Sequence, residues 1–272
     1  MAKGDVVVKA DKIRRWQKMG KYIKLALLIL LLILIVIYLV LKVFFSDGSF
    51  SVSIDNNDML YSGLAMYESR NDPMPKRRLS AKDVQFMDNI SIKWLPSNID
   101  IEAEGSHNGD NYVAYTFFIE NQGNLMFNYW YNVAMTDVMR NADEALRIMI
   151  IINGERTVYA KPSPMNGDAE CALYSGNRSN KCQEKSTPFR DDEDGTIILQ
   201  KRANVQPGDI DRITVVVWIE GDDPECLDNL IGGRVRLDMK IIEEHTEESI
   251  KDKESALWKE QISERKIVRL NH

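Results

Sequence analysis

The sequence predicts a mainly β protein that is held in a membrane by one N-terminal helix. Three observations support this fold class: an uncharged apolar run over residues 25–41, a series of β-branched and aromatic segments that begins at Phe50, and a charged stretch after residue 242. The expected parts are a basic cytoplasmic segment (1–24), a transmembrane helix (25–45), an extracellular antiparallel β-sandwich of jelly-roll type (46–242) and a charged helical tail (243–272).

The run 25–41 contains no charged residue, Gly or Pro. Seventeen residues at about 1.5 Å each span roughly 25 Å, and residues 43–45 extend this toward the ~30 Å hydrocarbon thickness of a bilayer. A core helix normally carries some polar residue over this length. A cleaved signal peptide ends in small residues, whereas this run ends in Lys-Val-Phe-Phe. A permanent signal anchor is therefore expected, with cleavage as the alternative.

The charges on either side of the helix predict its orientation. Residues 1–24 hold eight Lys or Arg against two Asp, so the N-terminus should stay in the cytoplasm and the chain after Ser46 should be exported. Residues 1–45 carry nine basic and two acidic side chains within a total net charge of -6, which leaves residues 46–272 at about -13. This acidic balance argues against nucleic acid as a partner, and the apolar helix makes the lipid bilayer the expected one.

The part after the helix reads as a series of short strands. Phe50, Val52 and Ile54 alternate with serines, as in a strand with one buried face, and Asn153-Gly154 suits a type I′ hairpin turn. Residues 59–67 are predicted as a helix and residues 221–233 as a short helical turn. The ten expected strands are 50–54, 90–95, 99–103, 112–119, 125–135, 146–152, 155–160, 196–202, 212–219 and 234–242.

Three cysteines follow the apolar run. Cys171 and Cys182 enclose ten residues of a long polar loop and are the favoured disulfide pair, with loop closure worth on the order of 2–3 kcal/mol. Cys226 is interpreted as a buried small apolar residue, with an intermolecular bridge as the alternative.

Signatures of catalysis are lacking in the sequence. It holds three histidines and neither an H-E-x-x-H nor a G-x-S-x-G motif, so no catalytic, cofactor-binding or metal residue is assigned and no enzyme is expected. The acidic run 191–194 is a calcium candidate, but Arg190 stands at the first-ligand position and a solvated loop is preferred. Helix capping is expected to explain the acidic residues Asp222, Asp223 and Glu225.

Three segments, residues 115–123, 143–160 and 215–226, resemble the TasA and camelysin-like exported β-sandwich proteins of Firmicutes. The resemblance covers about residues 50–242 and implies a jelly-roll-like sandwich at the cell surface. That family includes biofilm fibre subunits and a protein described as a protease. This chain differs from the family in lacking a cleavage site and in carrying a charged tail.

The expected function is structural: a single-pass cell-surface protein that assembles with itself or with other envelope proteins, or that serves in adhesion. The alternatives are an exported, camelysin-like hydrolase and an accessory subunit of a membrane complex. Phe50, Val52 and Ile54 form the candidate assembly strand, because a short alternating strand near the membrane is able to pair with a neighbour's open edge. The alternative is a first strand that pairs within its own sheet.

Overall fold

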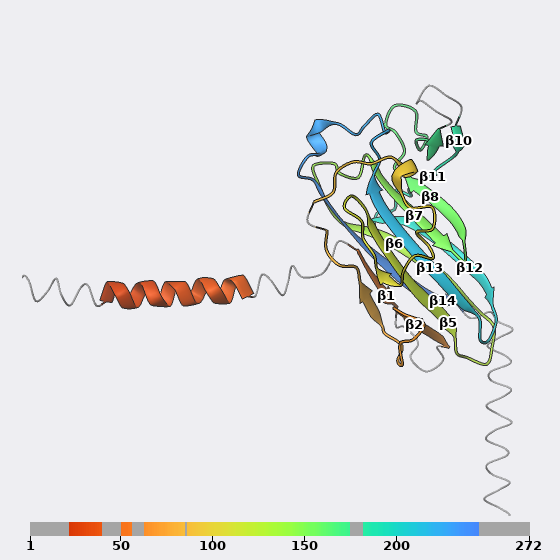
Figure 1. The fold of residues 1–272 in the computed structure, drawn as a ribbon, viewed down its shortest axis with the longest axis horizontal. Coiled ribbons are helices and arrows are strands. Elements are labelled where there is room, and N and C mark those ends of the chain that lie inside the picture. Colours follow the sequence, from red (N-terminus) through yellow and green to blue (C-terminus); the bar gives the residue numbers. More distant parts are fainter. Residues whose placement is uncertain (1–21, 40–49, 56–62, 85, 175–181, 245–272) are drawn as a thin grey trace, which may run out of the picture. The chain divides into compact units, whose positions relative to one another are not determined.

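The computed structural model describes residues 22–39, 50–55, 63–84, 86–174 and 182–244 (Figure 1). The chain divides into two compact units, Met1–Asp47 and Gly48–His272, and the second is called the β unit below. The predicted helical tail, 243–272, lies outside the described residues except for its first two, which belong to a strand.

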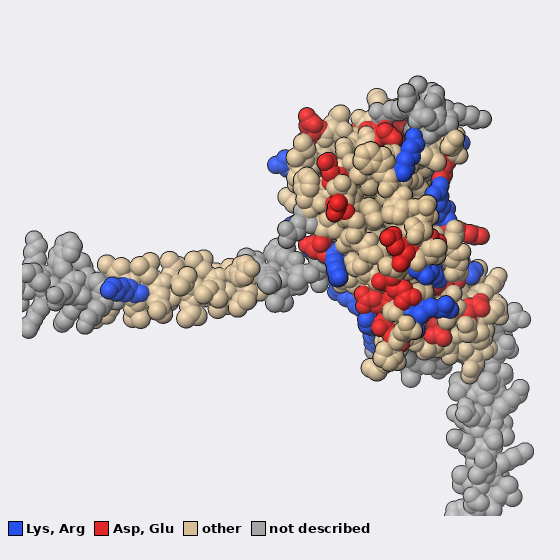
Figure 2. Space-filling model, in the orientation of Figure 1, with Lys and Arg blue, Asp and Glu red and all other residues tan. Residues whose placement is uncertain are grey.

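The first unit contributes an α-helix over Tyr22–Leu39, long and apolar enough to cross a membrane. Lys24 is its only charged residue, and Figure 2 shows the rest of the helix free of acidic and basic groups. Its side chains are exposed throughout. A membrane anchor and an N-terminal signal sequence both have these properties.

The β unit contains a five-stranded sheet and a seven-stranded sheet. The five-stranded sheet has the order β12 (Thr196–Val205), β6 (Phe127–Met139), β14 (Arg234–Glu244), β1 (Phe50–Ile54) and β3 (Arg78–Ser80). The seven-stranded sheet has the order β11 (Thr187–Pro188), β8 (Glu155–Ala160), β7 (Leu146–Ile152), β13 (Ile210–Ile219), β5 (Val113–Asn121) and β2 (Leu64–Tyr67), with β4 (Gly105–Ser106) also paired to β5. A separate pair joins β9 (Leu173–Tyr174) to β10 (Cys182–Glu184).

Both large sheets are mixed, which corrects the expectation of purely antiparallel strands. β1 runs parallel to β14, and β11 runs parallel to β8. The β1–β14 pair joins residues far apart in the sequence, and period-two alternation carries no information on the direction of a partner strand.

One hydrophobic cluster takes side chains from both large sheets. Phe50 and Tyr129 come from the five-stranded sheet, and Tyr115, Ile148 and Val215 come from the seven-stranded sheet. Burial of these side chains supplies the main driving force for bringing the two sheets together.

A second cluster lies on the other face of the seven-stranded sheet and includes Met149, Val216 and Trp218. Strands β7 and β13 are therefore buried on both faces, which explains their nearly continuous apolar sequences. Ile92 and Ile99 belong to the same second cluster.

Two sequence expectations about elements are wrong, and a third is confirmed in part. The segments 90–95 and 99–103 are not strands: they form the 3₁₀ turn η1 (Ile92–Trp94), turns and bends, and Ile90, Ile92 and Ile99 cover the sheet from outside. The expected helix 59–67 is strand β2 over its described part. The segment 221–233 does hold a short helical turn, the 3₁₀ turn η2 (Asp228–Leu230), but the residue at its N-cap is Leu227 and not the expected Asp222 or Asp223.

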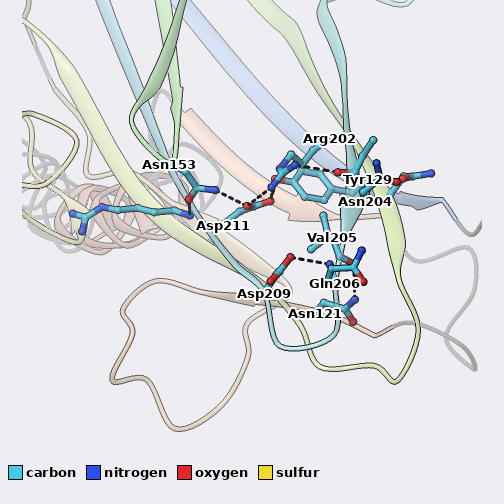
Figure 3. A network of polar contacts seen from close by, with 12 residues as sticks. Asn121, Tyr129, Asn153, Arg202, Asn204, Val205, Gln206, Asp209 and Asp211 are labelled. Carbon is cyan, nitrogen blue, oxygen red and sulfur yellow. Dashed lines mark hydrogen bonds and ion pairs between the residues drawn. The ribbon is translucent and has the colours of Figure 1, made fainter.

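The Asn153–Gly154 hairpin is confirmed, since both residues have the positive φ that a type I′ turn needs, at 52° and 88°. Figure 3 shows how this turn is tied to the sheets through Asp211, which is 2% exposed. The Asp211 carboxylate accepts hydrogen bonds from Asn153 Nδ2 at 2.6 Å, from the Tyr129 hydroxyl at 2.9 Å and from Arg202 Nε at 3.1 Å. Because Tyr129 lies on β6 and Asp211 on β13, this network links the two sheets.

Candidate functional site

The strand proposed from the sequence as an assembly site, β1, lies inside the five-stranded sheet rather than at its edge. Its register places Phe50 opposite Leu237 and Val52 opposite Met239 of β14. Phe50 and Val52 are 1% and 0% exposed, and Ile54 is half-buried. In the structure of the single chain, β1 therefore pairs within its own sheet, and its apolar side chains fill the core that the two sheets share.

The two neighbours of β1 differ greatly in length. β14 has eleven residues and pairs with all five of β1, whereas β3 has three residues and pairs with the middle of the strand. The Ser51 hydroxyl, on the opposite face from Phe50, donates a hydrogen bond to the Asp238 carboxylate. β1 is thus one short strand between a long partner and a minimal one.

A second candidate region surrounds the disulfide. Cys171 and Cys182, the pair favoured by the sequence, are joined by a disulfide whose Cα atoms are 5.8 Å apart. The bond sits beside the β9–β10 pair and closes the loop that holds it, of which residues 175–181 lie outside the described part. Cys171 also lines a small cleft of about 270 Å³, a volume that includes open solvent.

Arg147 lies at the bottom of this cleft and is 1% exposed. It forms an ion pair with Asp223, which is 5% exposed, and its Nη1 donates a hydrogen bond to the Leu146 carbonyl at 3.1 Å. A buried charge normally needs such a partner, since leaving it uncompensated is very unfavourable. The pair ties strand β7 to the segment that follows β13.

Glu220 is the second buried acid of the cleft and is 3% exposed. It accepts hydrogen bonds from Trp218 Nε1 at 2.9 Å, from the Ile92 amide at 3.0 Å and from the Asp222 amide at 3.2 Å. Burial raises the pKa of Glu220, while these donors and Arg147 act in the opposite direction. The chain's own donors satisfy this carboxylate, which suits a structural role better than general acid–base chemistry.

The acidic residues that were expected to cap a helix make other contacts. Asp222 accepts a hydrogen bond from the Ser91 hydroxyl at 3.0 Å, Asp223 pairs with Arg147, and Glu225 accepts from the Ser163 hydroxyl at 2.7 Å. Sequence reasoning missed the Arg147–Asp223 pair. The available signal was an arginine inside the apolar strand 146–152. A buried strand contains an arginine only where an anionic partner pairs with it.

The acidic loop 191–194 is held by local contacts. Asp192 forms an ion pair with Arg190 at 2.8 Å, and the Thr196 amide donates to Asp194 at 2.9 Å, which lowers the pKa of Asp194. Among the described residues, no group of three or more His, Cys, Asp or Glu is arranged to hold a metal ion.

The remaining candidate side chains, those of histidine and cysteine, also have contacts within the described part of the chain. The His107 ring contacts the carbonyl oxygens of Gly105 and Ile99, each at 3.0 Å, whereas His245 and His272 lie outside the described residues. Cys226 is unbonded and half-buried, and its sulfur accepts from Asn89 Nδ2 at 3.2 Å.

The fold and these sites define a mainly β unit that follows an apolar helix. No protein-family model matches the sequence, and no curated protein matches it. Among solved structures, a β-glucosidase from Kluyveromyces marxianus in complex with glucose aligns at 12% identity and a TM-score of 0.25, covering 76% of this chain. A selenomethionine-labelled crystal of that enzyme aligns at 10% identity and a TM-score of 0.23, covering 72% of this chain. The chain spans 19% and 18% of those two structures, and likeness at this level carries no argument about fold or activity.

Proposed function

We propose that this chain is a single-pass membrane protein that displays its β unit outside the cell and serves there in assembly or adhesion within the envelope. The observation that carries the proposal is the disulfide between Cys171 and Cys182 in a unit that follows an apolar helix. Disulfides persist in oxidising compartments and are rare in the cytosol. The eight basic residues before the helix favour the same orientation.

The finer architecture that we propose for the β unit is a β-sandwich of jelly-roll type. Its support is the hydrophobic cluster shared by the two large sheets, together with two polar contacts between them. One joins Tyr129 to Asp211, and the other is the hydrogen bond that Asn121 Nδ2 of β5 donates to the Val205 carbonyl of β12 at 2.9 Å. The resemblance to the TasA and camelysin-like proteins is consistent with this arrangement.

For assembly, the proposed element is β1. β1 has five residues, lies beside the eleven-residue β14 and fills the core with its apolar side chains. When β1 leaves this position, it opens a gap that the β1 of a second chain would occupy. The alternative is the pairing within one chain that the structure displays.

Topology is tested by adding a protease to intact protoplasts. The expected result is digestion of the β unit with a small membrane-bound N-terminal fragment left behind, because the bilayer and cytoplasm protect residues before Phe45. Release of an intact β unit into the medium, with a new N-terminus near Ser46, would show signal-peptide cleavage instead. Full protection would contradict the proposed orientation.

Assembly through β1 is tested with Val52→Pro, which removes one backbone donor and fixes φ. Met66→Pro, at a fully buried position of β2, is the matched control for damage to a strand. If β1 is donated between chains, Val52→Pro abolishes association in light scattering and melts like the monomeric parent, whereas Met66→Pro lowers the melting temperature. If both variants melt early and the parent stays monomeric over a wide concentration range, the assembly role fails.

A further inference from the structure

Several of the exposed large hydrophobic side chains of the β unit lie at one end of it. The registers Arg234–Met139, Ile219–Leu146 and Arg147–Ala160 bring the loops 140–145, 161–169 and 220–233 to this end, which is called the entry end below. The exposed large hydrophobic side chains that these loops, the turn η1 and the end of β6 carry are Trp94, Val138, Met139, Met165, Leu227 and Ile231.

The opposite end has a different character. Its tight turns at 153–154 and 206–209 read Asn-Gly and Gln-Pro-Gly-Asp, and Ile210, which follows the second turn, is 39% exposed. At the entry end, Leu227 is 61% exposed, Ile231 66% and Trp94 78%. Figure 1 shows the blue segment that contains η2 at one end of the strands and the turn before β13 at the other. Clustered exposed apolar groups on one face mark an interaction site more often than scattered ones do.

The chain enters the β unit near this end. Phe50, the first residue of β1, pairs with Leu237, which lies three residues after the start of β14 at Arg234, and β1 then runs away from the entry end. Residues 40–49 connect Leu39 to Phe50, and ten residues reach at most about 36 Å when fully extended. β14 ends at Glu244, at the opposite end.

We infer that the entry end docks on the surface of the lipid bilayer in which the apolar helix lies, with Leu227 and Ile231 entering the boundary between headgroups and acyl chains. These two residues flank η2, and Arg140 Nη1 holds the loop by donating to the Ile231 carbonyl at 3.0 Å. An exposed tryptophan such as Trp94 suits the same boundary, because its ring is apolar and its N–H is polar. The inference rests on the proposed membrane anchoring.

The charges nearby indicate which lipid is needed. Acidic residues outnumber basic ones in the loops of the entry end: Asp222, Glu225 and Asp228 are among eight acids, and Arg140 and Lys161 are the two bases. A net acidic set gives no attraction to anionic lipid, so apolar contact is the main contribution. Zwitterionic phosphatidylcholine is therefore a sufficient probe.

The test uses the full-length chain reconstituted in vesicles of phosphatidylcholine whose acyl chains are either plain or brominated. Tryptophan is introduced by Leu227→Trp, by Ile231→Trp and, as the matched control, by Ile210→Trp. Bromine quenches tryptophan only at contact. The expected result is loss of most of the added emission for the first two variants and no loss for the third, each compared with the parent chain.

Two other outcomes overturn the inference. If the chain resists alkaline carbonate extraction but positions 227 and 231 are quenched no more than position 210, the helix is embedded and the entry end does not touch lipid; a protein partner would then be the better occupant. If carbonate removes the chain from the vesicles, the membrane anchor itself fails and the docking inference fails with it.

Discussion

Arg147 illustrates how one charged side chain constrains a whole strand. It occupies the second position of β7, whose other residues are apolar and buried up to Ile151. The strand accommodates this charge only because Asp223, 76 positions later in the chain, lies beside Arg147 and pairs with it. The same contact fixes the start of the loop 221–233, so a core residue and a surface loop depend on each other.

The first prediction concerns this pair. Asp223→Asn should lower the free energy of unfolding by about 3–5 kcal/mol, because it leaves the Arg147 guanidinium buried without a counter-charge. Asp222→Asn is the control, since Asp222 contacts the Ser91 hydroxyl in an exposed setting. Urea unfolding of the detergent-solubilised chain measures both. Equal stabilities for the two variants would contradict the structural role of the pair.

A complementary variant separates charge from packing. Replacing both partners, as Arg147→Met with Asp223→Leu, removes the buried charges together. It should recover much of the stability that Asp223→Asn loses. A double variant as unstable as the single one would show that other contacts of the two side chains dominate.

The second prediction is a pH dependence from Glu220. Its pKa is raised in the folded chain, mainly by burial, so the folded state binds this proton more tightly than the unfolded state does. Its contribution to stability is fully present below the unfolded pKa and is lost as pH rises through the folded pKa. Glu220→Gln should remove this component from a plot of the urea midpoint against pH. An unchanged slope would contradict the assignment.

At the scale of elements, the long strands were predictable and the connections between them were not. Strands β5 to β8 and β12 to β14 carry enough β-branched and aromatic residues to be recognised from local pattern alone. Segment 90–103 has a similar local composition, but Ile92 and Ile99 cover a sheet from outside instead of joining a ladder. A short apolar run does not reveal which of these two ways it is buried.

The same limit applies to the candidate sites. The disulfide was accessible from the sequence because its cysteines are close together in one polar loop. The pairs β1–β14 and Arg147–Asp223 join distant segments, so their partners depend on the whole topology. The strands of two or three residues, such as β3 and β11, are too short to produce a periodic signal.

The third prediction concerns the disulfide as an element that closes a loop. The double variant Cys171→Ser/Cys182→Ser should lose about 2–3 kcal/mol of stability, because the unfolded chain gains the freedom of an open loop of about this size. Cys226→Ser should leave stability nearly unchanged, since that cysteine is unbonded. Thermal unfolding of the detergent-solubilised variants measures both, and a stable double variant would show that the loop is held by other contacts.

At the scale of the whole molecule, the β unit extends two residues further than the sequence suggested. β14 runs to Glu244, and its last part contains Ile241, which is 0% exposed and lies in the shared core. The boundary expected after residue 242 therefore falls inside a strand. Side chains of β14 and of its neighbouring strands form part of the one continuous core that both sheets share.

The fourth prediction follows from this boundary. A chain that ends after Glu244 should melt close to the parent, because the residues removed are rich in charge and include few large apolar side chains. A chain that ends after Lys240 should melt lower by roughly 5 °C or more, since it loses the burial of Ile241 and the end of the β14 ladder. Circular dichroism melts compare the two. A large loss in the first truncation would show that the tail packs on the β unit.

The parallel pairing of β1 with β14 determines how the β unit would respond to mechanical force. β1 starts near the entry end, and β14 finishes at the opposite end. In a chain held by its N-terminal helix, a pull on the C-terminal side would act along both strands in opposite directions. The ladder between five residue pairs would then be loaded in shear, with its evenly spaced hydrogen bonds sharing the tension rather than opening one after another. Such a geometry resists extension along the line from the start of β1 to the end of β14.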